Sequence, residues 1–188
     1  MDFIFCWILI SNLTTNNYMP RNVEERLHIC SNIISYTPKG EDPTLALSVA
    51  WRESRFTDTK GSWLCTRKGT LVKTKAGSYR CISHPEKKIS KLVRAEGPMQ
   101  ILKIYHCKGK GPKCNTAKEG VKHLYRMVKQ HGKLKGLAIY AGGYVNPKSM
   151  RYAKNAISRQ EDIRAMLPDD YPERLPKSLM PWLWKVIK

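Results

Sequence analysis

The chain has 188 residues, 41% of them hydrophobic, and a formal net charge of +19 from 34 Lys and Arg against 15 Asp and Glu. This length and hydrophobic content predict one compact domain with a true core and short appendages. The charge excess rules out a surface charged only for solubility and predicts a polyanionic partner, either nucleic acid or an anionic cell envelope.

The chain begins with a short apolar run, residues 3–10, in the sequence M-D-F-I-F-C-W-I-L-I. It is shorter than the roughly twenty apolar residues of a transmembrane helix. Asp2 and the lack of a small-residue cleavage site argue against a standard signal peptide for export. We expect a short strand or helix that docks on the body or on a partner. A helix is expected next, over 22–35, and 37–40 should end it.

The stretch 42–56, D-P-T-L-A-L-S-V-A-W-R-E-S-R-F, predicts the central helix. Asp42 and Pro43 are typical of an N-cap and a first helical position. Leu45, Val49 and Glu53 are spaced by four, and Phe56 follows three later, so all four are expected on one buried stripe. Burial and the negative end of the helix dipole should both raise the pKa of Glu53. A carboxyl group kept protonated near neutral pH is suited to general acid catalysis.

The rest of the chain predicts a small β lobe followed by helices. Residues 57–93 carry spaced glycines and alternating apolar residues typical of a β-hairpin: Gly61, Gly69, Gly77, Leu71, Val72, Thr74 and Tyr79. Helices are expected over 98–105, 117–131, 134–140 and 147–166. The predicted class is therefore α+β and mainly α-helical. The predicted divisions are 1–36, packed on the body, a domain over 37–166, and a Pro- and Trp-rich tail over 167–188. We expect the tail to pack on the domain, and contact with a membrane surface is the alternative.

Six cysteines leave their pairing open. No C-x-x-C pair is present, which disfavours a zinc ribbon. Cys107 and Cys114 bracket a turn-forming loop, and Cys65 and Cys81 flank the predicted hairpin, so each pair is a candidate disulfide. Disulfides would require an oxidising compartment, and free buried thiols are the alternative.

Three short motifs follow one another along the chain: A-W-R-E-S-R-F at 50–56, A-E-G-P-M-Q-I at 95–101 and L-A-I-Y-A-G-G-Y at 137–144. Together they resemble the lysozyme-like, soluble lytic transglycosylase family, over roughly residues 42–163. That family has a Glu-Ser pair at a helix end, a Gly-x-Met-Gln turn and an Ala-x-Tyr-Asn-Ala-Gly-like segment. The resemblance implies a lysozyme-like fold with a β-hairpin lobe beside the substrate cleft. The long segment between Glu53 and Gly97 implies an inserted hairpin over that cleft.

The resemblance also implies roles for individual residues. Glu53 matches the catalytic acid and base, and Ser54 matches the residue that orients it or the substrate. Gly97, Met99 and Gln100 match the turn that lines the cleft; Pro98 is expected to begin a helix, and Met99 fits core packing as well as substrate contact. From the third motif, the residues expected to bind substrate are Tyr140, Ala141, Gly142 and Tyr144.

The third motif departs from the family pattern, because Ile139-Tyr140 stands where Tyr-Asn is common. The tyrosine that often hydrogen-bonds the catalytic Glu is therefore either absent or supplied by Tyr140, with Tyr144 in reserve. A hydrolysing glycosidase would also need a second carboxylate, for which the candidates are Asp58, Glu86 and Glu96.

By resemblance, the expected activity is peptidoglycan lytic transglycosylation, which cuts the bond between N-acetylmuramic acid and N-acetylglucosamine and forms a 1,6-anhydro ring. It needs one carboxyl group and no metal or cofactor. The alternatives are a goose-type muramidase and a catalytically silent virion or nucleic-acid-binding protein. The expected partners are glycan strands, anionic envelope polymers and other virion proteins, rather than nucleic acid.

The expected setting is a bacteriophage virion, as a tail or internal protein acting in the host envelope, or an endolysin. A bacterial enzyme of a secretion or conjugation apparatus is the other possibility. Several lysines are candidates to line the approach of an anionic substrate: Lys73, Lys75, Lys87, Lys88, Lys91, Lys108, Lys110 and Lys113.

Overall fold

A computed structural model of the chain describes residues 2–13, 22–66, 70–75, 77–83 and 91–166. As predicted, the protein belongs to the α+β class and is mainly helical, with a small antiparallel β part. The helices are α1 (Asp2–Leu13), α2 (Val23–Tyr36), α3 (Pro43–Ser54), α4 (Lys103–His106), α5 (Thr116–His131), α6 (Lys133–Gly142) and α7 (Pro147–Ala165). The strands are β1 (Lys60–Cys65), β2 (Thr70–Lys73), β3 (Tyr79–Ile82), β4 (Leu92–Glu96) and β5 (Ile101–Leu102).

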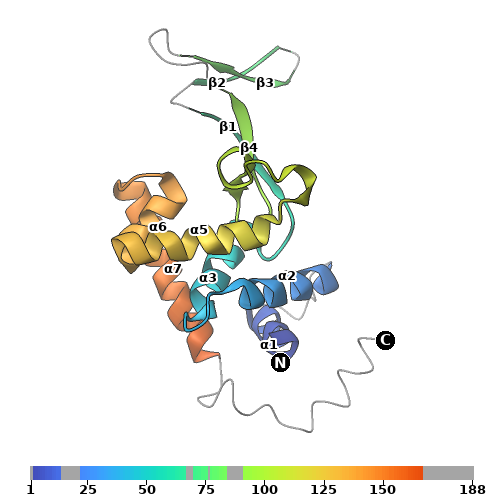
Figure 1. The fold of residues 1–188 in the computed structure, drawn as a ribbon, viewed down its shortest axis with the longest axis vertical. Helices are drawn as coiled ribbons and strands as arrows, with labels where there is room; N and C mark the ends of the chain where they lie inside the picture. The colour runs from blue at the N-terminus through green and yellow to red at the C-terminus, as the bar shows by residue number, and fades with distance from the viewer. Residues whose placement is uncertain (1, 14–21, 67–69, 76, 84–90, 167–188) are drawn as a thin grey trace.

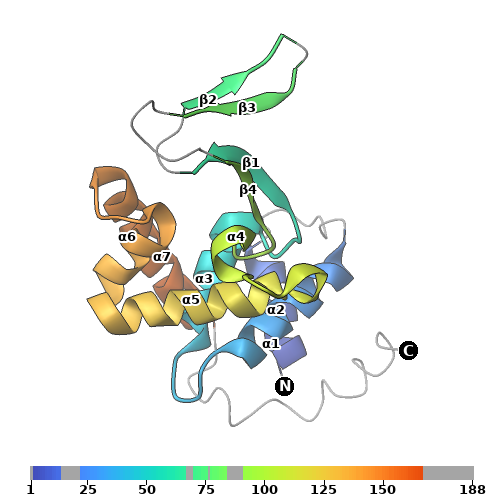
Figure 2. The ribbon, with the colours of Figure 1, turned by 45° about the horizontal axis from the view of Figure 1, so that its top comes forward.

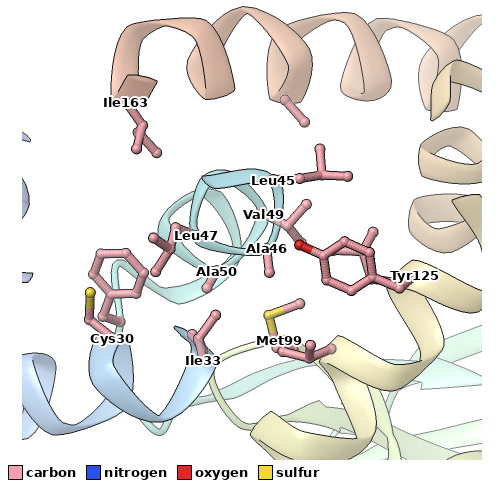
Figure 3. Packing of buried hydrophobic residues seen from close by; sticks show 14 of the residues in the cluster. Cys30, Ile33, Leu45, Ala46, Leu47, Val49, Ala50, Met99, Tyr125 and Ile163 are labelled. Carbon is pink, nitrogen blue, oxygen red and sulfur yellow. The ribbon is translucent and has the colours of Figure 1, made fainter. Parts of the chain in front are cut away.

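Helix α3 forms the centre of the core. Its predicted start is confirmed, because the Asp42 carboxylate accepts a hydrogen bond from the Thr44 N–H at 2.9 Å and Pro43 is the first helical residue. Every residue over 44–50 is buried, so the predicted single stripe is wrong for the first two turns. Figure 3 shows the reason: side chains from other elements surround this helix, among them Ile33, Met99, Tyr125 and Ile163.

The end of α3 differs from the expected stripe as well. Arg55 caps the helix in a left-handed conformation with φ of 54°, and Phe56 has φ of 58°. Phe56 is fully buried, at 0% exposure, but it reaches the core through this left-handed turn rather than as a helical neighbour of Glu53. A positive φ is strained for a non-glycine residue and persists only where packing stabilises it. The burial of Phe56 provides that stabilisation.

The β part forms two small antiparallel units. Strands β1, β4 and β5 make one sheet in the order β1-β4-β5, with Trp63 opposite Arg94, while β2 and β3 form a separate hairpin. The Cys65–Cys81 disulfide ties β3 to β1. Figures 1 and 2 show this hairpin at the end of the molecule farthest from the helices. The β lobe predicted over 57–93 is thus present, although Gly69 lies outside the described residues.

The helix predicted over 98–105 is wrong. Residues 97–100 form a turn, 101–102 form β5, and only 103–106 are helical. Gly97 and Gln100 have φ of 78° and 48°, values that an α-helix does not allow, and Ile101 pairs with Glu96 across the sheet. Pro98 therefore lies inside a turn closed by the Gln100 N–H and the Gly97 carbonyl at 3.1 Å, and it begins no helix.

The N-terminal segment is a helix that belongs to the same core as the rest of the protein. Phe5, Leu9 and Ile10 of α1 are buried in the cluster that also includes residues of α2, α3, α5, α6 and α7. A disulfide from Cys6 to Cys30 joins α1 to α2, a pairing that the sequence did not suggest. None of the described helices combines the length and apolar character needed to cross a bilayer.

The three helices α5, α6 and α7 follow the predicted ranges to within two residues at each end. Their starts are set by side chains: Asn115 caps α5, and Asn146 forms a reciprocal capping box with Ser149 at the start of α7. Helices α6 and α7 pack on each other, and α7 also packs on α3. This arrangement brings the middle of α7 against the end of α3. The tail predicted to pack on the domain, 167–188, lies outside the described residues.

Candidate active site

Glu53 lies in the last turn of α3, in line with the buried Val49 and partly buried itself. Its carboxylate accepts a hydrogen bond from the Tyr152 hydroxyl of α7. Burial raises the pKa of Glu53 above its ordinary value, while the bond from Tyr152 and the positive charge of Arg52 lower it by a smaller amount. The net result is a carboxyl group that holds its proton to higher pH than an exposed glutamate does.

Tyr152 is the residue at this site that sequence reasoning missed. The Arg52 guanidinium lies over the Tyr152 ring, 4.6 Å from the ring centroid, in a cation–π contact. The Tyr152 hydroxyl donates a hydrogen bond to Glu53. Burial, followed by the nearby Glu53 charge, raises the pKa of Tyr152 well above the ordinary tyrosine value, so the hydroxyl remains a donor. A signal was present: Tyr152 precedes the buried Ala156, Gln160 and Ile163 at spacings of four, four and three, so it shares one face of α7 with them.

The tyrosines of the third motif do not fill the role considered for them. Tyr140 donates its hydroxyl to the Met99 carbonyl at 2.6 Å, and Tyr144 is 66% exposed, whereas Tyr152 binds Glu53. Burial, followed by the Glu53 charge, raises the pKa of Tyr140 well above the ordinary tyrosine value, so its hydroxyl remains a donor. Ala141 and Gly142 are exposed at the end of α6.

The Gly97 turn is fastened to the end of α3 by side-chain hydrogen bonds. The Ser54 hydroxyl donates to the Pro98 carbonyl at 3.0 Å, and the Thr57 N–H donates to Ser54 Oγ at 3.2 Å. The Gln100 amide donates to the carbonyls of Gly97 at 2.8 Å and Thr59 at 3.1 Å. Ser54 and Gln100 therefore position this turn beside Glu53.

Gly97 and Met99 are set by packing. A Cβ on Gly97 would stand 2.0 Å from Thr116 Oγ1, and φ there is 78°, so only glycine fits between β4 and the start of α5. Met99 is fully buried, with 0% exposure, and packs against Gly120 of α5. Of its two expected roles, the structure therefore places Met99 in the core.

No second carboxylate is brought to Glu53 within the described part of the chain. Asp58 is exposed, and its backbone N–H donates to Glu25 at 3.1 Å. Glu96 forms an ion pair with Lys103 at 2.6 Å. Glu86 lies outside the described residues. In the part of the chain that the structure describes, the groups that shift the pKa of Glu53 are Tyr152 and Arg52, and neither is a carboxylate.

A histidine pair borders the site on the side of Tyr140. The rings of His106 and His123 are 4.3 Å apart, and His123 is 5.4 Å from the Tyr140 ring. Burial, His106 and Arg126 together lower the pKa of His123 to about 4, so it is neutral at physiological pH. In the described part of the chain, no three His, Cys, Asp or Glu side chains gather where they could hold a metal ion.

The candidate lysines are spread over the β part and the loop before α5. Lys73, Lys75 and Lys91 are exposed, as are Lys108, Lys110 and Lys113, whereas Lys87 and Lys88 lie outside the described residues. Lys110 pairs with Glu119. The loop that carries the last three is closed by the Cys107–Cys114 disulfide, one of the two pairings that the sequence had left open.

The chain was compared with family models, with curated proteins and with solved structures, and none of them matches it. Its function must therefore be inferred from its own residues and geometry.

Proposed function

We propose that this protein is a peptidoglycan lytic transglycosylase with Glu53 as its single catalytic acid and base. The observation that carries the proposal is the meeting of three motifs, distant in sequence, around one carboxyl group. The Ser54 and Tyr140 hydroxyls both donate hydrogen bonds to the Gly97 turn, and burial raises the pKa of Glu53, the sequence neighbour of Ser54. A chain that only needed to fold has no use for a desolvated carboxyl group here, because burying it costs stability.

In the proposed reaction the Glu53 carboxyl group protonates the glycosidic oxygen, and the bond from C1 of N-acetylmuramic acid to that oxygen breaks. The acetamido group of the same sugar stabilises the developing cation at C1. The Glu53 carboxylate then takes the proton of the 6-hydroxyl, and the bond from O6 to C1 closes the anhydro ring. Glu53 ends protonated as it began, and no water is consumed.

The residues around Glu53 support both halves of this cycle. The raised pKa favours the protonated carboxyl group that the first step needs. The Tyr152 hydroxyl donates to the carboxylate that forms when the proton leaves, and so orients it for the second step. Among the described residues no carboxylate acts on Glu53, which favours the one-carboxylate route over a water-consuming muramidase.

Charge and disulfides support a place of action at the cell envelope. Peptidoglycan peptides and envelope polymers are anionic, and the net charge of +19 would draw the protein to them. Disulfides persist in oxidising compartments, and all six cysteines are paired. The setting we propose is that of a bacteriophage wall-cleaving protein, either a virion component or an endolysin, acting on the host wall.

The test is mass spectrometry of the fragments released from purified peptidoglycan. The wild type should release 1,6-anhydromuramyl ends, and Glu53→Gln should lose about 100-fold or more of the rate, since it cannot donate the proton. Glu161→Gln is the matched control: Glu161 is exposed on α7, and its loss should leave the rate unchanged.

Other outcomes would overturn parts of the proposal. Reducing ends in place of anhydro ends would establish a muramidase. Cleavage by Glu53→Gln at the wild-type rate would remove Glu53 from the mechanism. No cleavage of any wall type by the wild type, together with salt-sensitive DNA binding, would favour the catalytically silent binding protein.

A further inference from the structure

A polar hollow lies between the C-terminal half of α3 and the middle of α7, and the proposed reaction does not use it. Its volume is about 420 Å³, and it is lined by Trp51, Arg52, Arg55, Asn155, Ser158, Arg159 and Asp162. Glu53 is absent from this lining, although it is the sequence neighbour of Arg52. The hollow is therefore a second feature beside the carboxyl group.

The lining carries three arginines against one carboxylate. Arg159 and Asp162 form only a long contact of 3.9 Å, and both are about half exposed, at 45% and 54%. Such a pair contributes little and leaves the Arg159 donors available. Arg55 has no carboxylate partner among the ion pairs of the described residues. The hollow thus gathers positive charge that these residues of the chain do not neutralise.

Backbone contacts hold Arg55 in place. The Arg55 N–H donates to the Trp51 carbonyl at 2.9 Å, and the Arg55 carbonyl accepts from the Arg26 guanidinium at 3.1 Å. Its left-handed φ of 54° is maintained by this helix cap. Because the backbone of Arg55 is already fixed by these bonds, binding a ligand there needs no ordering of the backbone, and only the side chain loses freedom.

Arginine guanidinium groups bind oxyanions with paired N–H donors, and the neighbouring Asn155 and Ser158 add an amide and a hydroxyl. We propose that this hollow is a binding site for an oxyanion, a carboxylate or a phosphate group, held between Arg55, the C-cap of α3, and Arg159 of α7, with Arg52 at its edge. The site takes the charged group of a larger molecule or a free ion by the same contacts.

Arg52 connects the hollow to the carboxyl group. Its guanidinium lies 4.6 Å from the centroid of the Tyr152 ring, and its charge lowers the pKa of Glu53. An oxyanion bound beside Arg52 offsets that charge, so Glu53 holds its proton to higher pH when the hollow is filled. This consequence for cleavage rests on the proposed function, whereas binding of the oxyanion does not.

The experiment is a titration of the full-length protein with inorganic phosphate and, separately, with acetate, at constant ionic strength, followed through the arginine side-chain and backbone NMR signals. Saturable shifts of Arg55 and Arg159 are expected, and Arg55→Gln and Arg159→Gln should each weaken binding at least about fivefold. Asp162→Asn should tighten it, because the competing carboxylate is gone. Tighter phosphate binding would indicate a phosphate group as the natural ligand, and tighter acetate binding a carboxylate.

Arg151→Gln is the matched control, since Arg151 is exposed on the same helix, lies outside the hollow and loses the same charge. It should bind as the wild type does. Equal weakening by Arg151→Gln and Arg159→Gln would show attraction to the net charge only, and shifts that never saturate would show no site. Either result overturns the proposal, and neither depends on whether the protein cleaves peptidoglycan.

Discussion

The carboxyl group of Glu53 is set between opposing influences. Burial in the last turn of α3 raises its pKa, and both Tyr152 and Arg52 lower it by less. A general acid must be protonated to act, so the rate should fall as the pH rises through the pKa of Glu53. The hydrogen bond from Tyr152 therefore orients the Glu53 carboxylate, and it also lowers the fraction of Glu53 that is protonated at a given pH.

Replacing Tyr152 by Phe should change both the pKa of Glu53 and the rate of cleavage. Loss of the hydrogen bond removes an influence that lowers the pKa of Glu53, so the alkaline limb of the pH–rate profile should move to higher pH. The rate at the optimum should fall about 10- to 100-fold, as expected for the loss of a hydrogen bond to a charged group. The measurement is the initial rate of wall cleavage across the pH range.

Tyr125→Phe is the control for this change. Tyr125 is also buried, and its hydroxyl donates to the Asp42 carbonyl at 2.7 Å, at the opposite end of α3 from Glu53. Its loss should lower the free energy of unfolding without moving the alkaline limb. Superimposable profiles for the wild type and Tyr152→Phe would contradict the role given to Tyr152.

At the level of elements, the site depends on a turn that is held between a sheet and a helix. The turn 97–100 leaves β4 through Gly97, contacts α3 through Ser54, and returns as β5. The Thr116 side chain at the start of α5 packs directly on Gly97. The position of the turn beside Glu53 thus depends on contacts from three separate elements.

Gly97→Ala should be strongly destabilising. The new Cβ would meet Thr116 Oγ1 at 2.0 Å and would also be held at positive φ, so we expect a loss of about 2–5 kcal/mol in the free energy of unfolding. Gly109→Ala is the matched control: φ is 73° there, but nothing lies within 4 Å, so the loss should be about 1 kcal/mol. Denaturant unfolding measures both, and equal losses would contradict the contact with Thr116.

The disulfide between α1 and α2 should stabilise the protein more than the one that closes the loop before α5. The sequence separations are 24 for Cys6–Cys30 and 7 for Cys107–Cys114. Closing the longer loop should contribute about 3 kcal/mol, roughly 1 kcal/mol more than the shorter one. Unfolding of the two double Cys→Ala variants tests the order, and a larger loss for Cys107 and Cys114 would contradict it.

At the level of the whole molecule, the helices form one core while the hairpin β2–β3 stands away from them (Figure 1). Lysines lie exposed on this hairpin and on the loop before α5. A field from +19 charges acts over the whole surface and attracts any polyanion. Charge is therefore expected to bring the protein to the wall, while the geometry around Glu53 selects the bond.

Binding of Glu53→Gln to intact purified wall should weaken steeply with salt. The Debye length falls from about 30 Å at 0.01 M to about 8 Å at 0.15 M ionic strength, which screens exposed charges. Co-sedimentation with the wall measures the bound fraction, and neutral dextran particles, which should bind little at any salt concentration, serve as the control. Salt-independent retention on the wall would indicate that binding does not depend on charge.

Patterns local in the chain sufficed for much of the fold. Asp42 and Pro43 determined where α3 begins, and glycines with alternating apolar residues marked the β lobe, because caps and turns depend on residues adjacent in sequence. Local helix signals failed at 98–105, because Gln100 is held in a left-handed conformation by bonds to Thr59 and Gly97. Tertiary contacts there outweigh local preference.

The sequence by itself determined the mainly helical class, the alignment of Glu53 with the buried Leu45 and Val49 along α3, and the identity of the carboxyl group that we propose as the acid. Only the tertiary structure decided which tyrosine binds it, since Glu53 and Tyr152 are 99 residues apart, and which cysteine pairs with Cys6. The hollow between Arg55 and Arg159 is likewise visible only when α3 and α7 are packed. Periodicity reports which face of a helix is buried; the partner on that face is chosen by packing of the whole chain.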